Sequence, residues 1–304
     1  MTAPATESRA EKGKRRLEAF TVYLQPRVLI VMFLGFASGL PLALSGSTLQ
    51  IWARESGVDL GTIGLFALVG TPYTLKFLWA PVVDALGVPV LSRLLGRRRG
   101  WLIFSQLLLV AAILFLATCD PAVSPAFVAL GALLVATASA TQDIVIDAFR
   151  VESLPQREQA AGMASYVAAY RIGMLVSTLG VLFLVSGFET WGSSKSSAWV
   201  WGFVAMAALI AIGMVASLVA TEPEPSRAAE DEQRERRDTP LTRLAKAATG
   251  AFSEILAHEL AVVVLLFVVL YKLCDAFAGT MTAAFVIDLG FTRTDYATIV
   301  KGVG

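Results

Sequence analysis

The chain has 304 residues, of which 56% are hydrophobic and only 16% carry a charge. A soluble domain carries a charge on about a quarter of its residues, so this composition excludes an ordinary soluble domain. Several uncharged stretches approach the length of about 20 residues that a membrane-spanning helix needs. The strands of a membrane β-barrel are shorter, at about ten residues, and alternate in hydropathy. We therefore predict an all-α polytopic membrane protein, and the net charge of +1 adds little to this conclusion.

Seven complete spans are predicted, together with the start of an eighth. The complete spans cover residues 28–53, 62–83, 101–119, 125–149, 160–188, 198–220 and 260–287. The eighth begins near Asp295 and the chain stops at Gly304, which gives about half the length that a span requires. We therefore expect a fragment of a longer protein. An Asp-x-x-Thr-Ile pattern begins at Asp59 and again at Asp295, which would fit a repeated six-helix unit.

The long polar segment after the sixth span divides the chain into three parts. Residues 1–220 are predicted to form an N-terminal cytoplasmic segment and a six-helix transmembrane bundle. Residues 221–259 are predicted to form a cytoplasmic linker. Its second half, from the cap Thr239 and Pro240 onward, has the apolar spacing of an amphipathic helix. Residues 260–304 begin a second, truncated bundle, whose first helix we expect to be loosely attached.

The placement of lysine and arginine predicts the orientation, because these residues accumulate in cytoplasmic loops. The N-terminal segment, the second-to-third loop, the fourth-to-fifth connection and the linker are all rich in them, whereas the opposite loops contain only Arg54, Lys195 and Arg293. The N-terminus is therefore predicted to be cytoplasmic. Four tryptophans near the opposite loops are predicted to form an aromatic belt at the membrane surface. They are Trp52, Trp191, Trp199 and Trp201.

Ionisable side chains within the spans or at their edges are the candidate functional groups. They are Lys76, Asp84, Asp143, Asp147, Arg171, Lys272 and Asp275. Each costs about 2.5–3.5 kcal/mol at the centre of a bilayer on insertion scales, so each needs a partner or an interior cavity. A rise of about 1.5 Å per residue places Arg171 and Lys272 near the middle of the bilayer.

The chemistry of these groups divides their roles. Arginine keeps its proton in proteins, so Arg171 can hold an anion but cannot carry a proton. A carboxyl group shielded from water can exist in its neutral form, so it can load and release a proton. Asp143 and Asp275 are therefore the candidates for proton coupling, and the sequence does not decide between them. Lys272 and Asp275 could instead neutralise each other, because they lie three residues apart on one helix.

Cations and tyrosines inside the spans are the predicted substrate contacts. They are Arg171, Lys76, Lys272, Tyr73 and Tyr170. Tyrosine rings at these positions, and at Tyr166, would either stack on sugar rings or simply pack in the core. A second set of charges, at the cytoplasmic edge, is predicted to form a gate. Its members are Asp84, Arg97, Arg98, Asp147, Arg150 and Glu152.

Several stretches resemble the AmpG-type muropeptide permeases of the major facilitator superfamily. They are "SGLPLALSGSTLQIW" (38–52), "GTPYTLKFLWAPVVD" (70–84), "GRRRGW" (96–101), "TQDIVIDAFRVESLP" (141–155), "YRIGML" (170–175) and "YKLCDAFAG" (271–279). One departure is visible after the fourth span, where Gln159 stands in place of the arginine expected in "ESLPQREQ". Arg157 is the candidate to substitute for that arginine.

The resemblance implies a fold, an activity and a location. The fold would be that of the major facilitator superfamily, with an N-terminal six-helix bundle and the beginning of a second bundle. The activity would be proton-coupled import of N-acetylglucosaminyl-anhydromuramyl peptides across the bacterial inner membrane, during cell-wall recycling. The resemblance implies a monomer that needs no cofactor and no metal, binds no nucleic acid and is not an enzyme.

Three alternatives stay open at this point. An acetyl-CoA or other organic-anion transporter of the same superfamily would also need cations within its spans. An intramembrane aspartyl protease pairs two carboxylates from different helices, whereas Asp143 and Asp147 share one helix, which disfavours this class of enzyme. The isolated chain would also be compatible with a membrane scaffold that transports nothing.

Overall fold

The computed structural model describes residues 21–223, 261–296 and 298, except for the side chains of residue 268 and of residues 272–283. Every regular element in this part of the chain is helical, as predicted. Five helices are long and apolar enough to cross a membrane. The predicted amphipathic helix of the linker falls on residues 224–260 and lies outside the described residues.

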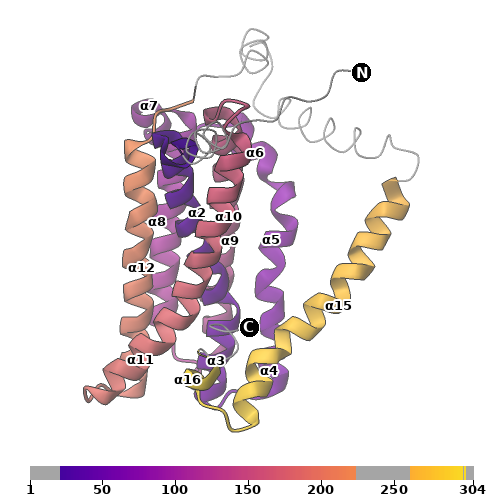
Figure 1. Cartoon of the computed structure of the whole chain (residues 1–304). Coiled ribbons are helices and arrows are strands. Elements are labelled where there is room, and N and C mark those ends of the chain that lie inside the picture. Colours follow the sequence, from indigo (N-terminus) through magenta and orange to yellow (C-terminus); the bar gives the residue numbers. More distant parts are fainter. Residues whose placement is uncertain (1–20, 224–260, 297, 299–304) are drawn as a thin grey trace, which may run out of the picture.

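The long helices stand side by side as one bundle (Figure 1). They are α2 (Pro26–Ser45) continued by α3 (Ser47–Glu55), α8 (Arg97–Ala117), α9 (Pro125–Ser153), α10 (Gln159–Leu175) continued by α11 (Val181–Thr190), and α12 (Lys195–Val219). A short helix, α7 (Leu91–Leu95), precedes α8. We call the end where α8 begins and α12 ends the Arg98 end. The opposite end, where α11 ends and α12 begins, is the Arg293 end.

The predicted second span, residues 62–83, is not one continuous helix. It is divided into α4 (Leu60–Leu65), η2 (Phe66–Gly70), α5 (Thr71–Leu75), η3 (Lys76–Leu78) and α6 (Ala80–Ala85). Proline lacks a backbone N–H and clashes with the preceding turn. Pro72 and Pro81 accordingly begin new segments. The pieces still follow one path along the edge of the bundle (Figure 1), so the position of the span was right and its continuity was wrong.

The first and fifth spans each contain an irregular segment at the point where the two spans contact each other. The first changes from α2 to α3 at Gly46, and the fifth contains a π-helical segment, Val176–Gly180, between α10 and α11. The Thr48 hydroxyl donates to the Ser177 carbonyl across this junction, at 3.2 Å. A π-helical turn displaces carbonyls from the regular ladder, and Thr48 supplies one of them with a partner.

Glycines let α2 and α10 touch backbone to backbone, as small residues do at membrane helix interfaces. A Cβ added at Gly39 would lie 2.0 Å from the Tyr170 carbonyl oxygen, and one at Gly173 would lie 2.3 Å from the Phe36 carbonyl oxygen. This close approach brings the middle of α2 against the tyrosines of α10. The glycines therefore set the geometry of the cavity that these helices share.

The substitution Gly39→Ala is expected to destabilise the protein, because the new methyl group meets a backbone atom rather than a flexible side chain. Overpacking of this kind costs about 1–3 kcal/mol, which should lower the melting temperature in detergent. Gly187→Ala is the matched control, since nothing lies within 4 Å of its Cβ position on α11. Equal melting temperatures for the two variants would contradict the close approach of α2 and α10.

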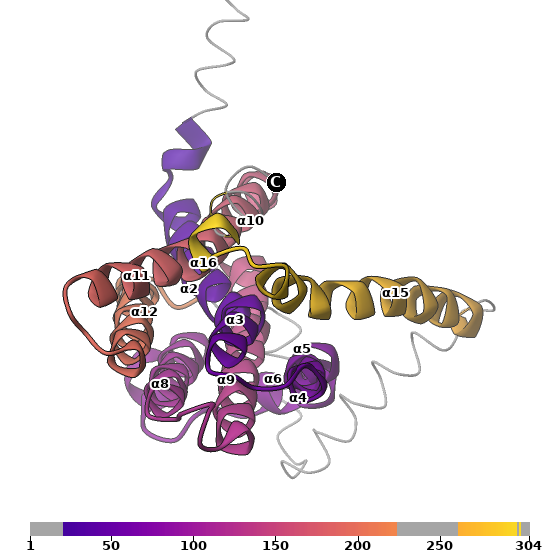
Figure 2. The same ribbon diagram turned by 90° about the horizontal axis from the view of Figure 1, so that it is seen from below.

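The helix α15 (Ala261–Asp288) leans away from the bundle toward its Ala261 end (Figure 1). Its other end is held against the bundle at the Arg293 end, where α16 (Arg293–Asp295) lies beside α11 (Figure 2). Ala284 is fully buried there. The described part of α15 is therefore attached to the bundle at this end, and the expectation that the helix is loosely held stays a prediction.

The first residues of the two Asp-x-x-Thr-Ile patterns, Asp59 and Asp295, occupy different helix positions. Asp59 is the N-cap of α4, where Thr62 donates to its carboxylate and holds the pKa of that group below its usual value. Asp295 instead lies inside the first turn of α16, in a capping box with Thr292. The side chains of this pattern therefore give no structural support for a repeated unit.

The predicted aromatic belt is wrong for two of its four members. Trp52 and Trp199 are buried, and their rings stack with centroids 5.9 Å apart. Trp191 and Trp201 are exposed, as a belt requires. Hydropathy gives the depth of a tryptophan but not the helix face on which it lies, and the buried pair lies on faces that pack within the bundle.

Candidate functional site

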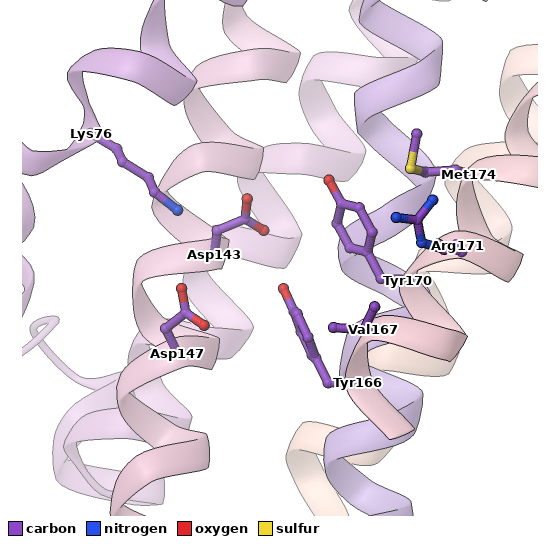
Figure 3. A pocket seen from close by; sticks show the side chains of 8 residues that line it. All are labelled: Lys76, Asp143, Asp147, Tyr166, Val167, Tyr170, Arg171 and Met174. Atoms are coloured by element: carbon purple, nitrogen blue, oxygen red, sulfur yellow. The ribbon is translucent and has the colours of Figure 1, made fainter. Parts of the chain in front are cut away.

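A cavity of about 420 Å³ lies between the broken second span and helices α9 and α10 (Figure 3). It is lined by Lys76, Asp143, Asp147, Tyr166, Val167, Tyr170, Arg171 and Met174. Asp143 lies ten residues before the Ser153 end of α9, which at 1.5 Å per residue is roughly 15 Å. The cavity therefore lies about halfway along the bundle, at the depth expected of a transport site near the bilayer midplane.

Asp143 is the buried acid of the cavity, with only 8% of its surface exposed. The Ser38 hydroxyl of α2 donates to its Oδ1 at 2.5 Å. The same hydroxyl lies 3.2 Å from the phenol oxygen of Tyr166. Ser38 was missed in the sequence, because a serine inside an apolar span shows no partner until the packing of α2 is known. Asp143, Ser38 and Tyr166 thus form a hydroxyl-bound carboxyl site.

Two cations line the same cavity. Lys76 projects from η3 toward Asp143, and Arg171 lies on α10 on the far side of the two tyrosines (Figure 3). Among the described residues, neither makes an ion pair with a carboxylate. Lys76 has the Asp143 carboxyl group in front of it (Figure 3), whereas Arg171 has no such neighbour there, and a cation without a counter-ion inside a span is costly. Arg171 is therefore suited to receive an anionic ligand. The predicted contacts of both cations with substrate stay predictions.

Two of the tyrosines form an aromatic surface in the cavity. The rings of Tyr166 and Tyr170, one turn apart on α10, lie 6.0 Å apart between centroids with an interplanar angle of 30°. Tyr73 was also predicted to contact substrate, but it does not line this cavity. Its ring packs against the core, and its hydroxyl is buried without a hydrogen-bond partner among the described residues.

Lys272 and Asp275 were predicted to take part in substrate binding and proton coupling. The backbone of both residues belongs to α15, but their side chains lie outside the described part of the structure. Their roles stay predictions.

Four of the predicted gate residues meet at the Arg98 end. The buried Arg98 side chain donates to Asp84 at 2.7 Å and to both carboxylate oxygens of Glu152, at 2.9 and 2.5 Å. Arg97 donates to the Asp84 carbonyl and lies 3.9 Å from Glu152. A two-point contact between guanidinium and carboxylate is among the stronger polar contacts in proteins. This cluster ties the end of the second span to α8 and α9.

Asp147 and Arg150, the other two predicted gate residues, lie elsewhere. Asp147 lines the central cavity (Figure 3). The Arg150 guanidinium lies 3.7 Å from the Asp147 carboxylate. Neither is among the partners of Arg98 in the described residues. On α9, Asp143 and Asp147 therefore face the cavity, whereas Glu152 belongs with Asp84, Arg97 and Arg98. We call these four residues the gate cluster after their predicted role, which stays a prediction.

The gate cluster has a member that the sequence did not reveal. Glu222, just after α12, accepts hydrogen bonds from the backbone N–H groups of Arg98 and Arg99, at 2.8 and 3.0 Å. A carboxylate is favoured at this position, because the first N–H groups of a helix have no intrahelical partner and carry partial positive charge. Gly96 makes room for it: its φ is +95°, and an added Cβ would lie 2.3 Å from the Glu222 side chain.

The departure at Gln159 also has a structural explanation. The Gln159 amide donates to the carbonyls of Val151 and Leu154, at 3.0 and 2.7 Å, and so closes the turn between α9 and α10. Arg157 was the candidate for the missing arginine, but its side chain is 87% exposed and lies 3.8 Å from its neighbour Glu158. Arg157 does not contact Asp84, Arg98 or Glu152 among the described contacts, and the acidic partner of Arg98 on this side is Glu152, in the last turn of α9.

The chain is similar in sequence to known membrane transporters. The Major Facilitator Superfamily profile matches residues 31–304. The anhydromuropeptide permease of Escherichia coli (strain K12) is 39% identical over 284 residues, which cover 93% of this chain and 53% of the relative. The putative transporter AmpG 4 of Rickettsia felis is 32% identical over 283 residues, which cover 93% of this chain and 65% of the relative. The chain thus spans about half to two-thirds of the length of these relatives.

The family match and the fold agree. The profile covers nearly all of the chain from the first span onward, and the described residues supply helices suited to crossing a membrane. The cavity with its charged lining lies about halfway along that bundle, beside α9 and α10. The chain belongs to the major facilitator superfamily of membrane transporters and is a homologue of the anhydromuropeptide permeases, as its sequence motifs predicted.

Proposed function

We propose that the chain forms part of a secondary active transporter that imports anhydromuropeptides together with protons across the inner membrane. The observation that carries this proposal is the cavity, whose lining combines a hydroxyl-bound carboxyl group with two cations that make no ion pair among the described residues. The relatives named as anhydromuropeptide permeases supply the substrate class. Peptide carboxylates of such a substrate would take the place of the missing counter-ions.

The charges of the cavity suggest how proton and substrate are coupled. With all groups ionised, Lys76 and Arg171 balance Asp143 and Asp147. A proton on Asp143 leaves a net positive charge, which attracts an anion more strongly because the surroundings have a low dielectric constant. Release of that proton restores the balance and weakens the hold on the substrate. Loading and unloading of the proton and of the substrate would thus accompany each other.

The aromatic surface supports a carbohydrate-containing substrate. Sugar rings stack on aromatic side chains through their C–H faces, and the Tyr166–Tyr170 pair offers such a face beside Arg171. A disaccharide peptide is larger than a cavity of about 420 Å³. We therefore propose that these residues hold one end of the substrate, and that a second six-helix bundle completes the site, as in other transporters built from two repeats.

We propose that the Arg98 end faces the cytoplasm. It contains Arg97, Arg98 and Arg99, together with the start of an arginine-rich linker, and positive residues accumulate on that side of a membrane. The cluster of Asp84, Arg98 and Glu152 would then act as the cytoplasmic gate. Glu222 would connect this gate to the linker that leads toward the second bundle.

An organic-anion transporter, for example of acetyl-CoA, is the second candidate, because Lys76 and Arg171 would suit its phosphates equally well. Uptake of labelled anhydromuropeptide into membrane vesicles separates the two, with the chain extended to the length of its relatives. We expect saturable uptake that unlabelled muropeptide inhibits and acetyl-CoA does not. Inhibition by acetyl-CoA, without inhibition by unlabelled muropeptide, would favour the organic-anion transporter instead.

Ser38→Ala is expected to move the pH dependence of uptake. When Asp143 is ionised, the Ser38 hydroxyl stabilises its charge by donating to Oδ1, and a hydrogen bond to a charged group contributes about 1.5–3 kcal/mol. Its loss favours the protonated form, so the pH at which uptake falls by half should rise by about one unit or more, because one unit corresponds to 1.36 kcal/mol. The measurement is initial uptake rate against pH.

Ser105→Ala is the control for this prediction. Ser105 is equally buried, but its hydroxyl bonds to a carbonyl of its own helix. Its pH profile should match that of the parent protein. A Ser38→Ala profile that also matches the parent would show that Ser38 does not position Asp143.

A further inference from the structure

Lys76 reaches the cavity from the irregular part of the second span. It begins η3, a single 3-10 turn that lies between α5 and α6. Pro72 and Pro81 begin α5 and α6, so a regular α-helix does not continue on either side of this turn. A short 3-10 stretch inside a helix often marks a hinge. The position of Lys76 relative to Asp143 therefore depends on contacts with the neighbouring helices.

Trp79 ends this turn and attaches it to α9. Its backbone N–H donates to the Lys76 carbonyl at 3.3 Å, so the two residues belong to one turn. Its indole N–H donates to the Thr141 hydroxyl of α9 at 3.1 Å. The ring packs against a hydrophobic core to which α2, α8, α9 and α12 contribute. Phe77 and Leu78, in the same turn, are 49% and 57% exposed. The Trp79 indole therefore connects the turn that carries the lysine to α9.

Thr141 is oriented to accept this hydrogen bond. Its hydroxyl donates to the Thr137 carbonyl, one turn earlier on α9, at 2.8 Å. A hydroxyl has one proton and two lone pairs, so the proton is committed to Thr137 and the oxygen is free to accept from Trp79. Asp143 follows two residues later on the same helix. The indole is thus bound to the turn of α9 from which Asp143 reaches the cavity.

The turn held by Trp79 brings a positive charge toward Asp143. The ionisable groups that face Asp143 or line the cavity with it are Lys76 of η3, Asp147 of α9, Tyr73 of α5, and Tyr166, Tyr170 and Arg171 of α10. Lys76 projects toward Asp143 (Figure 3), and a nearby positive charge favours the ionised form of a carboxyl group. This attraction weakens with distance. A displacement of Lys76 would therefore change how readily Asp143 binds a proton.

We propose that Trp79 is a positioning residue, whose hydrogen bond to Thr141 holds the irregular turn of the second span so that Lys76 stays beside Asp143. Trp79 does not line the cavity, so it acts through Lys76 and sets the pH at which Asp143 is loaded with a proton. Its part in transport rests on the proposed function. The protonation of Asp143 can be measured without transport, so the two proposals can fail separately.

Infrared spectroscopy measures the protonation of Asp143 directly, in the chain extended to the length of its relatives and placed in nanodiscs without substrate. The band of the protonated carboxyl group is assigned by its absence in Asp143→Asn and followed against pH. Trp79→Phe keeps an aromatic ring but removes the indole donor. We expect the midpoint to rise by about half a pH unit, a roughly threefold change in proton affinity, because the charged form loses part of its attraction to Lys76.

The double variant with Lys76→Gln separates positioning from general loosening of the bundle. Lys76→Gln alone should shift the midpoint in the same direction and further, because the charge is removed altogether. If Trp79 acts through Lys76, Trp79→Phe should add nothing to that shift. Thr141→Val removes the acceptor and keeps the shape of the side chain, so it should reproduce the shift of Trp79→Phe. If Trp79→Phe is not recovered folded, Thr141→Val decides, alone and combined with Lys76→Gln.

Trp101→Phe is the matched control. The Trp101 indole also donates to an oxygen, the Leu86 carbonyl at 2.8 Å, but Trp101 does not line the cavity. Its midpoint should equal that of the parent protein. The proposal is overturned if neither Trp79→Phe nor Thr141→Val moves the midpoint, if their shift is undiminished with Lys76→Gln, or if Trp101→Phe produces the same shift. Absence of muropeptide uptake by the parent would contradict the proposed function and leave this titration unaffected.

Discussion

Proton-driven uptake is expected to be lost when Asp143 is replaced by asparagine, while the protein still reaches the membrane. Asparagine keeps the size of the side chain and can accept the Ser38 hydrogen bond, but it cannot bind and release a proton. The measurement is uptake of labelled muropeptide into vesicles with and without an imposed pH gradient.

Asp147→Asn is the matched control for this prediction. Asp147 lies one turn away on the same helix and lines the same cavity, but its side chain is half exposed and it faces Arg150 at 3.7 Å. We expect this variant to retain uptake that responds to the gradient. Undiminished gradient-driven uptake by Asp143→Asn would remove Asp143 from proton coupling, and would direct attention to Asp275.

Arg171→Ala should abolish measurable uptake, and Arg171→Lys should restore only part of it. A guanidinium presents a planar fork that binds a carboxylate at two points, whereas an ammonium is a single point charge. Loss of the two-point contact in Arg171→Lys, at about 1.5–3 kcal/mol for charge-assisted hydrogen bonds, should raise the KM of uptake about 10- to 100-fold. The KM of Arg171→Lys is the readout, because Arg171 lines the cavity and makes no ion pair with another described residue.

Lys76→Arg provides the comparison for Arg171→Lys, since it makes the opposite exchange of head groups in the same cavity. We expect a smaller effect on KM, because a fork replaces a point charge there and the positive charge is kept. An Arg171→Lys variant with the affinity of the parent protein would show that two-point binding at this position is not required.

The bundle could be predicted from the sequence because it depends on a local property. Uncharged stretches of spanning length gave the long helices, and the two prolines that divide the second span were visible in the sequence as Pro72 and Pro81. Their effect was underestimated, since proline is tolerated in membrane helices when neighbours satisfy the freed backbone groups. Here the short segments of the second span are only partly buried, and the chain adopts several separate turns instead.

Part of the candidate site could also be predicted from a local property of the sequence. An isolated charge in an apolar span is conspicuous, so Lys76, Asp143 and Arg171 were found, and the cavity brings them together. The hydroxyl partner Ser38 lies 105 residues from Asp143 in the chain, and Glu222 lies 124 residues from Arg98. Such contacts depend on how helix faces pack, which a single sequence does not specify.

The ion pairs at the Arg293 end of the bundle show the same limit. Arg54, Lys195 and Arg293 were used in the sequence only to assign orientation, as the few positive residues of the opposite loops. Their acidic partners come from the ends of three other segments, up to 238 residues away in the chain. A count of charges per loop gives the side of the membrane, whereas the pairing of those charges requires the fold.

Uptake of labelled anhydromuropeptide into proteoliposomes tests the central claim most directly. The chain, extended to the length of its relatives, would be reconstituted with a pH gradient directed inward, and the parent would be compared with Asp143→Asn. The proposal predicts that the parent concentrates muropeptide only while the gradient lasts, and that Asp143→Asn does not concentrate it at all. Accumulation by the parent that is equally large after the gradient is dissipated would contradict proton-coupled transport through this cavity.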